Sequence, residues 1–296
     1  MTAYAPTSSH PMRGIALSLV GVFLLTASDA AIKWVTGSLP FGEALFIRSL
    51  FVLLPVALFV WQGGGLARLR IVSPRNLALR ALFGTASTFM IVASLSLLPI
   101  GEVLTLVFVT PILVTALAPL LLGEHVGWHR WLAVLGGFAG VVIMLRPDAG
   151  AFELVALLPL GAALIASLRD IVTRRISASE SSLAILTFSV FGMLLASLAT
   201  APFGWRAVGI EEIAVAGVSG LLFGVAHYMM IESYRFAEVS LVAPFRYTNL
   251  IWAPLLGFLL FGEIPDSGLL AGAPLIGACG LYIIWRERVV RRAGRR

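Results

Sequence analysis

Long apolar runs, each interrupted by only a few polar residues, follow one another along almost the whole chain. Ten such runs of about 20 residues are distinguishable. An α-helix of that length crosses the roughly 30 Å hydrocarbon core of a bilayer. The pattern therefore predicts ten transmembrane helices, at residues 13–36, 40–61, 76–97, 100–122, 128–145, 152–174, 182–202, 213–234, 239–261 and 267–285.

Composition supports an all-α, polytopic membrane protein. The chain is 59% hydrophobic and only 12% charged, whereas soluble domains carry about 25% charged residues. The connections between the runs are too short to hold a soluble ATP-binding domain, and no G-x-x-x-x-G-K-[ST] phosphate loop is present. An ATP-driven pump on this chain alone is excluded. The sequence also lacks CxxC, HExxH and GxSxG motifs, so we expect no enzyme, no metal and no cofactor.

Basic residues outside the runs predict the orientation, because Lys and Arg favour cytoplasmic loops. Alternate loops separate into a basic side and a side that is mostly acidic. Both termini are therefore expected in the cytoplasm of a multi-pass protein. The net charge of +6 does not indicate nucleic acid, because these arginines lie at membrane edges, where we expect lipid headgroups as partners. The basic side carries Arg13, Arg68, Arg70, Arg75, Arg130, Arg175, Arg235, Arg286, Arg288, Arg291, Arg292, Arg295 and Arg296.

The chain repeats itself. The stretch from 101 to 124 ends in "LLLGE" and the stretch from 237 to 263 ends in "LLFGE", so Gly123 and Gly262 read as matching helix stops. Residues 1–147 and 148–296 each hold five predicted spans. Because five is odd, the second half enters the membrane from the opposite side. Such an inverted repeat is typical of carriers that expose a site between their halves to alternate faces.

Two acid–base pairs interrupt the spans. Asp29 and Lys33 lie one turn apart toward the outer end of the first span, and Asp170 and Arg174 repeat this spacing toward the inner end of the sixth. Residues four apart share one helix face, and charges inside a bilayer usually face a bundle interior or a watery cavity. We interpret the pairs as outer and inner gates or as proton-coupling groups. The alternative is that Lys33 and Arg174 extend to the headgroups, with the aspartates as local partners.

Two further arginines lie about two turns inside spans, Arg48 in the second and Arg246 in the ninth. Neither has an acid four residues away, so each needs a carbonyl, an acid on another helix, or a substrate. An arginine fork suits a carboxylate because it bonds both oxygens at once. Arg246 is the stronger substrate-binding candidate, with a structural ion pair as the alternative. Its predicted companions are Tyr247, Asn249 and Trp252.

Other polar residues complete the candidate substrate site. The eighth span contributes His227, Tyr228 and Glu232, and the third contributes Ser87 and Ser94. Glu232 is also a candidate proton carrier. Because it lies one turn from the predicted cytoplasmic end, pairing with Arg235 at the rim is an equal alternative.

These features together resemble a known family. The "LLLGE" and "LLFGE" endings, "SDAAIKW" in the first span, "FIRSL" in the second and ten spans in two halves look like the EamA-type branch of the drug/metabolite transporter superfamily. The chain is most similar to bacterial aromatic amino-acid exporters. The resemblance implies ten helices around a central cavity, alternating access and location in the bacterial inner membrane.

The expected function is accordingly export of amino acids, with a broad range that includes aromatic ones, by a chain acting as a monomer. Carriage of another metabolite, such as S-adenosylmethionine or riboflavin, remains the alternative. A channel would need a polar stripe across the full bilayer, whereas these polar residues cluster near span ends. The direction of transport and any proton coupling are not written in the sequence.

Overall fold

The described part of the chain is helical. The computed structural model describes residues 10–62, 65, 69–97, 106–145, 154–262 and 267–293, and these contain no β-strand. Short 3₁₀ segments η2 (Leu154–Ala156), η3 (Ala201–Phe203) and η4 (Ala243–Thr248) lie between the α-helices. The α-helices are α1 (Pro11–Thr36), α2 (Phe41–Gln62), α3 (Pro74–Leu97), α5 (Thr110–Leu122), α6 (Trp128–Leu145), α7 (Leu157–Ile176), α8 (Ser182–Leu198), α9 (Ile210–Phe236), α10 (Val239–Val242), α11 (Asn249–Phe261) and α12 (Ser267–Ala293).

Eight of the ten predicted spans each correspond to one main α-helix. In the fourth, residues 106 and 107 are helical, residues 108 and 109 form a turn and α5 begins at Thr110, while the first residues of that span lie outside the described ranges. The ninth prediction was wrong in detail. Residues 239–261 form α10, η4 and α11 in succession rather than one continuous helix. Pro244 lies at the start of η4, and a proline cannot donate the backbone hydrogen bond that an α-helix needs at that position.

The tenth helix is longer than predicted. The apolar run ends at Trp285, but α12 continues to Ala293. Part of the arginine-rich tail, which we expected in a cytoplasmic loop, is therefore helical. At the other predicted stops the expectation was confirmed, because Gly123 and Gly262 end α5 and α11 with φ of 70° and 69°. Those left-handed values favour glycine.

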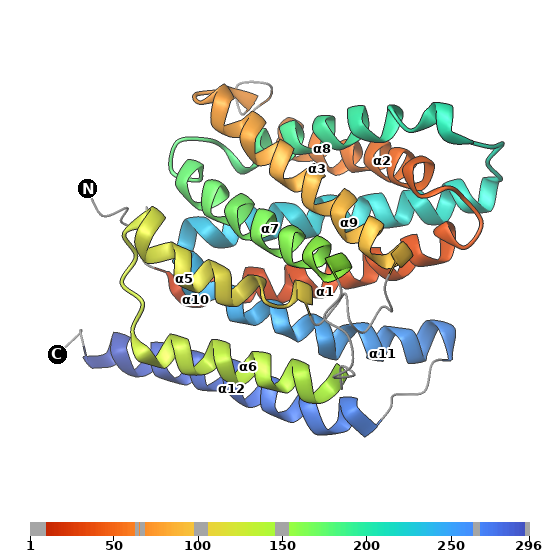
Figure 1. Ribbon diagram of the computed structural model, residues 1–296. Helices are drawn as coiled ribbons and strands as arrows, with labels where there is room; N and C mark the ends of the chain where they lie inside the picture. Colours follow the sequence, from red (N-terminus) through yellow and green to blue (C-terminus); the bar gives the residue numbers. More distant parts are fainter. Residues whose placement is uncertain are drawn as a thin grey trace.

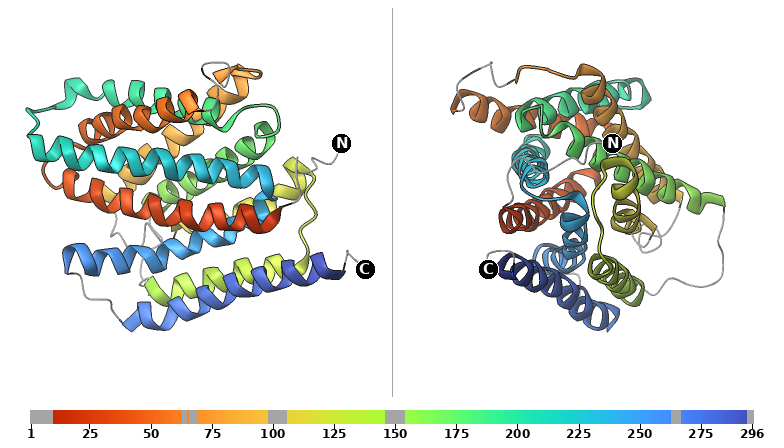
Figure 2. Two further views of the ribbon diagram at one scale, coloured as in Figure 1. Left: turned by 180° about the vertical axis from the view of Figure 1, so that it is seen from behind. Right: turned by 90° about the vertical axis from the view of Figure 1, so that its left-hand side faces the viewer.

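The helices pack side by side in one bundle, and α1 begins at the same end of it as α12 finishes (Figures 1 and 2). The most extensive contacts occur in matched sets. Helix α1 packs on α9 as α7 packs on α3, and α2 packs on α9 as α8 packs on α3. Helix α1 also contacts α11 as α7 contacts α5, while α2–α8 and α6–α12 pair with each other.

The outside of the bundle is apolar. By length and composition, α1, α2 and α9 are able to cross a membrane, and α5, α8 and part of α12 are shorter apolar helices. Large side chains such as Leu54, Leu195 and Leu281 are exposed. Apolar surface of this extent is unfavourable in water but suits lipid, so these helices build a multi-pass membrane protein.

Helices α2 and α9 are in close contact, and α2 carries Arg48 at that contact. A Cβ atom added at Gly220 would lie 2.4 Å from the carbonyl oxygen of Arg48, and one at Gly224 would lie 2.6 Å from Cγ of Pro55. Small residues let helix backbones approach this closely in membranes. The two glycines therefore set the separation of α2 from α9.

Candidate functional site

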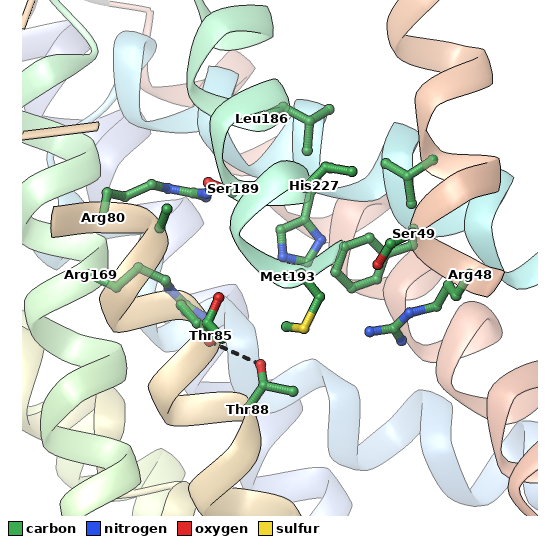
Figure 3. Close-up of a pocket in the computed structure, with 15 residues that line it drawn as sticks. Arg48, Ser49, Arg80, Thr85, Thr88, Arg169, Leu186, Ser189, Met193 and His227 are labelled. Carbon is green, nitrogen blue, oxygen red and sulfur yellow. Dashed lines mark hydrogen bonds between the residues drawn. The ribbon is translucent and has the colours of Figure 1, made fainter. Parts of the chain in front are cut away.

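A pocket lies in the bundle between α2, α3, α7, α8 and α9. Its empty space is about 520 Å³, part of which is open to solvent. Arg80 and Arg169 reach it from one side and Arg48 from the other, with His227 between them (Figure 3). None of the described residues that line it is acidic. They are Arg48, Ser49, Val52, Arg80, Ala81, Gly84, Thr85, Thr88, Arg169, Leu186, Ser189, Val190, Met193, Phe223 and His227.

Arg48 enters the pocket from α2 and is buried. Its guanidinium carbon lies 4.2 Å from the centroid of the Phe223 ring, a separation that suits a cation–π contact. Its Nη1 lies 3.8 Å from Oδ1 of Asp29. The acid on another helix that the sequence required for Arg48 is thus Asp29. Because the Asp29 side chain is 52% exposed, the pair is loose.

Arg80 enters from α3 and is also buried. Its Nε donates to Oγ1 of Thr173 at 3.2 Å, and its Nη1 donates to Oγ of Ser189. Both acceptors are neutral hydroxyls. These hydroxyls bond two nitrogens of the Arg80 guanidinium, and the described hydrogen bonds and ion pairs join no carboxylate directly to it.

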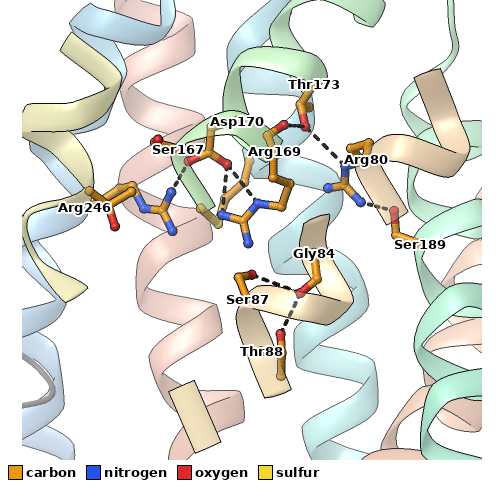
Figure 4. Close-up of polar contacts among 12 residues, drawn as sticks. Arg80, Gly84, Ser87, Thr88, Ser167, Arg169, Asp170, Thr173, Ser189 and Arg246 are labelled. Carbon is orange, nitrogen blue, oxygen red and sulfur yellow. Dashed lines mark hydrogen bonds and ion pairs between the residues drawn. The ribbon is translucent and has the colours of Figure 1, made fainter. Parts of the chain in front are cut away.

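Asp170 on α7 joins two arginines (Figure 4). Oδ1 accepts from Nη2 and Nε of Arg169 at 2.9 Å and 3.0 Å, and Oδ2 accepts from Nη1 of Arg246. The Asp170 side chain is only 6% exposed. The structural ion pair that was the alternative for Arg246 is present, and it ties η4 to α7.

His227 is the predicted site residue that lies in the pocket itself. Its ring stacks on Phe223 with centroids 4.0 Å apart. Its buried Nδ1 has no hydrogen-bond partner among the described residues. Buried polar atoms are normally hydrogen-bonded, so this nitrogen is an exception, which His227 shares with Tyr247 and Trp252.

The local pairing expected for Asp170 and Arg174 was wrong. Asp170 binds Arg169 and Arg246, whereas Nε of Arg174 lies 3.4 Å from Oε1 of Glu124 on the segment after α5. Both side chains are buried, so each finds a partner on a neighbouring element. Lys33 lies exposed in the last turn of α1.

Glu124 also holds the start of α10. Oε1 accepts from the backbone N–H of Val239 at 3.1 Å, and Oε2 accepts from the N–H and hydroxyl of Ser240 at 3.3 Å and 2.9 Å. A carboxylate at a helix N-terminus satisfies free N–H groups and meets the positive end of the helix dipole. Beside it, Arg130 pairs with Glu238. These contacts tie the α5–α6 segment to α10 at one end of the bundle.

The aromatic companions predicted around Arg246 lie elsewhere. Tyr247 is buried, with its ring against Gly137 of α6, so it packs rather than lines the pocket. Trp252 meets Phe23 edge-on at 5.3 Å. Asn249 accepts a 2.6 Å hydrogen bond from Thr26 on α1.

The remaining candidates also lie outside the pocket. Ser87 and Ser94 donate to carbonyls of their own helix. Tyr228 stacks near Phe59. Glu232 accepts from Ser182 at 2.5 Å and lies 3.5 Å from Arg235, as the rim alternative expected.

Sequence reasoning missed Arg80 and Arg169. Both lie inside predicted spans, at 76–97 and 152–174, and neither has an acid three or four residues away. That was the signal used for Arg48 and Arg246, and it was available here too. Both residues lie within about one and a half turns of a span end, where an arginine usually reaches the headgroups.

Positive charge exceeds negative charge around the pocket. Arg48, Arg80, Arg169 and Arg246 face two carboxylates, Asp29 and Asp170, in the described ion pairs and hydrogen bonds. A charge in the low-dielectric interior of a membrane protein is costly unless it is compensated. The arrangement is therefore able to accept an anion.

Comparison with known proteins finds one shared fold and several membrane transporters. A crystal structure of TM-score 0.78 covers 94% of this chain and 98% of its own at 21% identity, which shows the shared fold. The S-adenosylmethionine uptake transporter of Rickettsia bellii is 27% identical over 93% of this chain and 94% of the relative. The riboflavin transporter of Rhizobium johnstonii is 31% identical over 93% and 89%. The pseudopaline exporter CntI of Pseudomonas aeruginosa is 22% identical over 89% and 93%.

A family model gives the assignment. The model described as the EamA-like transporter family matches residues 12–146 and again residues 154–286. The members of this family are carriers and not enzymes, which agrees with the expectation from the sequence. The chain belongs to the EamA-like transporter family.

Proposed function

We propose that this transporter carries a small organic anion, one that bears carboxylate or phosphate groups, across the bacterial inner membrane. The observation that carries the proposal is a pocket lined by three arginines and by no described acidic residue. Arginine forks bind both oxygens of a carboxylate or phosphate. A bound anion compensates Arg80, whose own partners are neutral hydroxyls.

The same pocket has an apolar and aromatic side. Leu186, Val190 and Met193 of α8 face the Phe223–His227 stack of α9. We assign the anionic group of the substrate to Arg80 and Arg169, and its less polar remainder to this side. His227 Nδ1 is then available to bond a neutral polar group of the substrate.

Amino-acid export, the finer expectation from the sequence, ranks second. The carboxylate of an amino acid suits the arginines, but its ammonium group needs an acid. Asp29 and Asp170 already face arginines. A sulfonium cation such as S-adenosylmethionine meets the same difficulty. Riboflavin is a separate candidate, because its flat ring suits the aromatic stack and a riboflavin transporter is among the relatives.

The carrier works by alternating access between residues 1–147 and 148–296, with both termini in the cytoplasm. The matched packing of α1 on α9 and of α7 on α3 supports two halves of opposite orientation. Of the candidate proton carriers, Asp29 fits best, because it is half exposed and only 3.8 Å from Arg48. Asp170 and Glu232 are held by closer partners.

The test is uptake into liposomes that contain the purified protein. The panel is a dicarboxylate, a sugar phosphate, phenylalanine, riboflavin and S-adenosylmethionine, each with and without a pH gradient. We expect saturable uptake of an anion. Arg80→Gln should weaken it by about 10- to 100-fold, because a hydrogen bond to a charged group contributes about 1.5–3 kcal/mol.

Arg75→Gln is the matched control, since it removes the same charge from the exposed first turn of α3. Arg80→Lys keeps the charge without the fork and should retain part of the affinity. Uptake of the sulfonium cation in preference to every anion would refute the anion assignment, as would full activity of Arg80→Gln.

A further inference from the structure

A second cleft lies at the end of the bundle where α6 begins and α12 finishes, away from the central pocket. It holds about 690 Å³ of open space. Helix α10 closes it on one side. Its lining residues are His125, Gly127, His129, Arg130, Leu241, Tyr282, Ile283 and Arg286.

The described lining of this cleft has basic side chains and no acidic ones. Two of the basic groups already have partners, since Arg130 pairs with Glu238 and His129 bonds the hydroxyl of Tyr282. Arg286 therefore supplies the positive charge presented to a ligand, and His125 is a further lining residue able to form a hydrogen bond. An anion is the complementary ligand.

Aromatic residues place the cleft at the membrane surface. Trp128 opens α6 and is 63% exposed, and Trp285 on α12 is 58% exposed. One turn deeper along each helix, Leu132 and Leu281 are also exposed. Tryptophan is enriched where the hydrocarbon meets the headgroups. The cleft therefore lies at headgroup depth and beside lipid-facing surface.

We propose that this cleft binds the phosphate headgroup of an anionic phospholipid. Arg286 and His125 contact the phosphate, Trp128 and Trp285 lie at the interface, and the acyl chains follow Leu132 and Leu281. Helix α12 continues to Ala293. The sequence after Arg286 is mostly basic, with Glu287 followed by Arg288, Arg291 and Arg292. Basic pockets between transmembrane helices are able to bind acidic headgroups in this way. The site is independent of what the central pocket carries.

The test is native mass spectrometry of the full-length protein taken from bilayers with equal amounts of phosphatidylglycerol and phosphatidylcholine. We expect preferential retention of phosphatidylglycerol. Arg286→Gln should weaken this retention about fivefold, the effect of one basic residue near an anionic surface. His125→Gln should weaken it less, and the double variant more than either.

Arg75→Gln is the control for general attraction to headgroups, because it removes one exposed charge from the same predicted side but outside the cleft. Wild-type retention in both cleft variants, or equal loss in Arg75→Gln, would overturn the site. A titration with glycerol 3-phosphate separates a soluble ligand from a lipid. If the soluble phosphate bound in lipid-free micelles as tightly as the lipid does, a lipid site would be refuted. Size-exclusion profiles show whether each variant is folded. If Arg286→Gln does not fold, His125→Gln alone tests the cleft.

Discussion

Two aspartates with similar sequence surroundings have different positions in the molecule. Asp29 lies 3.8 Å from one arginine with its side chain 52% exposed, whereas Asp170 is 6% exposed and binds two arginines. Removing one partner of a buried ion pair leaves an uncompensated charge in a poor solvent for ions. The same substitution at the two positions should therefore have different effects.

Asp170→Asn should lower the free energy of unfolding by about 3–5 kcal/mol, because Arg169 and Arg246 lose their shared carboxylate. Asp29→Asn should lower it less, because this pair is wider, at 3.8 Å, and the Asp29 side chain is 52% exposed. Thermal unfolding in one detergent measures both. Equal shifts would mean that burial does not distinguish the two pairs.

Residue roles were predicted less well than residue positions. The sequence identified Arg48 and Arg246 as needing distant partners, and both have them. It did not identify which acid each arginine meets, because that depends on how α1, α2, α7 and η4 face one another. For the same reason Tyr247, predicted in the site, instead packs on Gly137.

At the scale of helices, length and apolar content were enough to locate most elements, since a span needs about 20 apolar residues whatever it packs against. The exceptions have local causes. Pro244 produced the 3₁₀ segment inside the ninth span, and polar residues after Trp285 hid the continuation of α12. The run of Gly217, Gly220 and Gly224 predicted a close helix contact, which was confirmed. The helix on the other side of that contact was not predictable, because it depends on how the whole bundle packs.

Gly220→Ala tests the separation of α2 and α9. The added methyl would lie 2.4 Å from the carbonyl oxygen of Arg48, so the helices must move apart at a cost of about 1–3 kcal/mol. Gly277→Ala in α12 is the matched control, because nothing in the described structure lies within 4 Å of its added methyl. We expect a lower unfolding temperature for the first variant alone. Equal behaviour would show that α9 is not in close contact with α2.

The orientation of the whole molecule in the membrane follows from its basic residues and from the even number of predicted spans. α1 begins and α12 ends at the same end of the bundle (Figure 1), so any orientation places both termini on one side. Basic residues predict that this side is the cytoplasm.

Reporter fusions test that orientation. A fluorescent protein that folds only in the cytoplasm should be bright when joined after residue 296, and alkaline phosphatase at the same place should be inactive. A fusion in the α8–α9 connection should give the reverse pattern. Phosphatase activity at the C-terminus would invert the assignment and move the lipid cleft to the outer leaflet.

The order of synthesis determines when the contacts of Glu124 with α10 are able to form. The free N–H groups of α10 find their acceptor 115 residues earlier in the chain, on Glu124. During synthesis the segment after α5 therefore leaves the ribosome long before Val239, and the carboxylate is in place when α10 arrives. Residues 148–296 expressed alone would lack this acceptor, and co-expression with residues 1–147 would restore it.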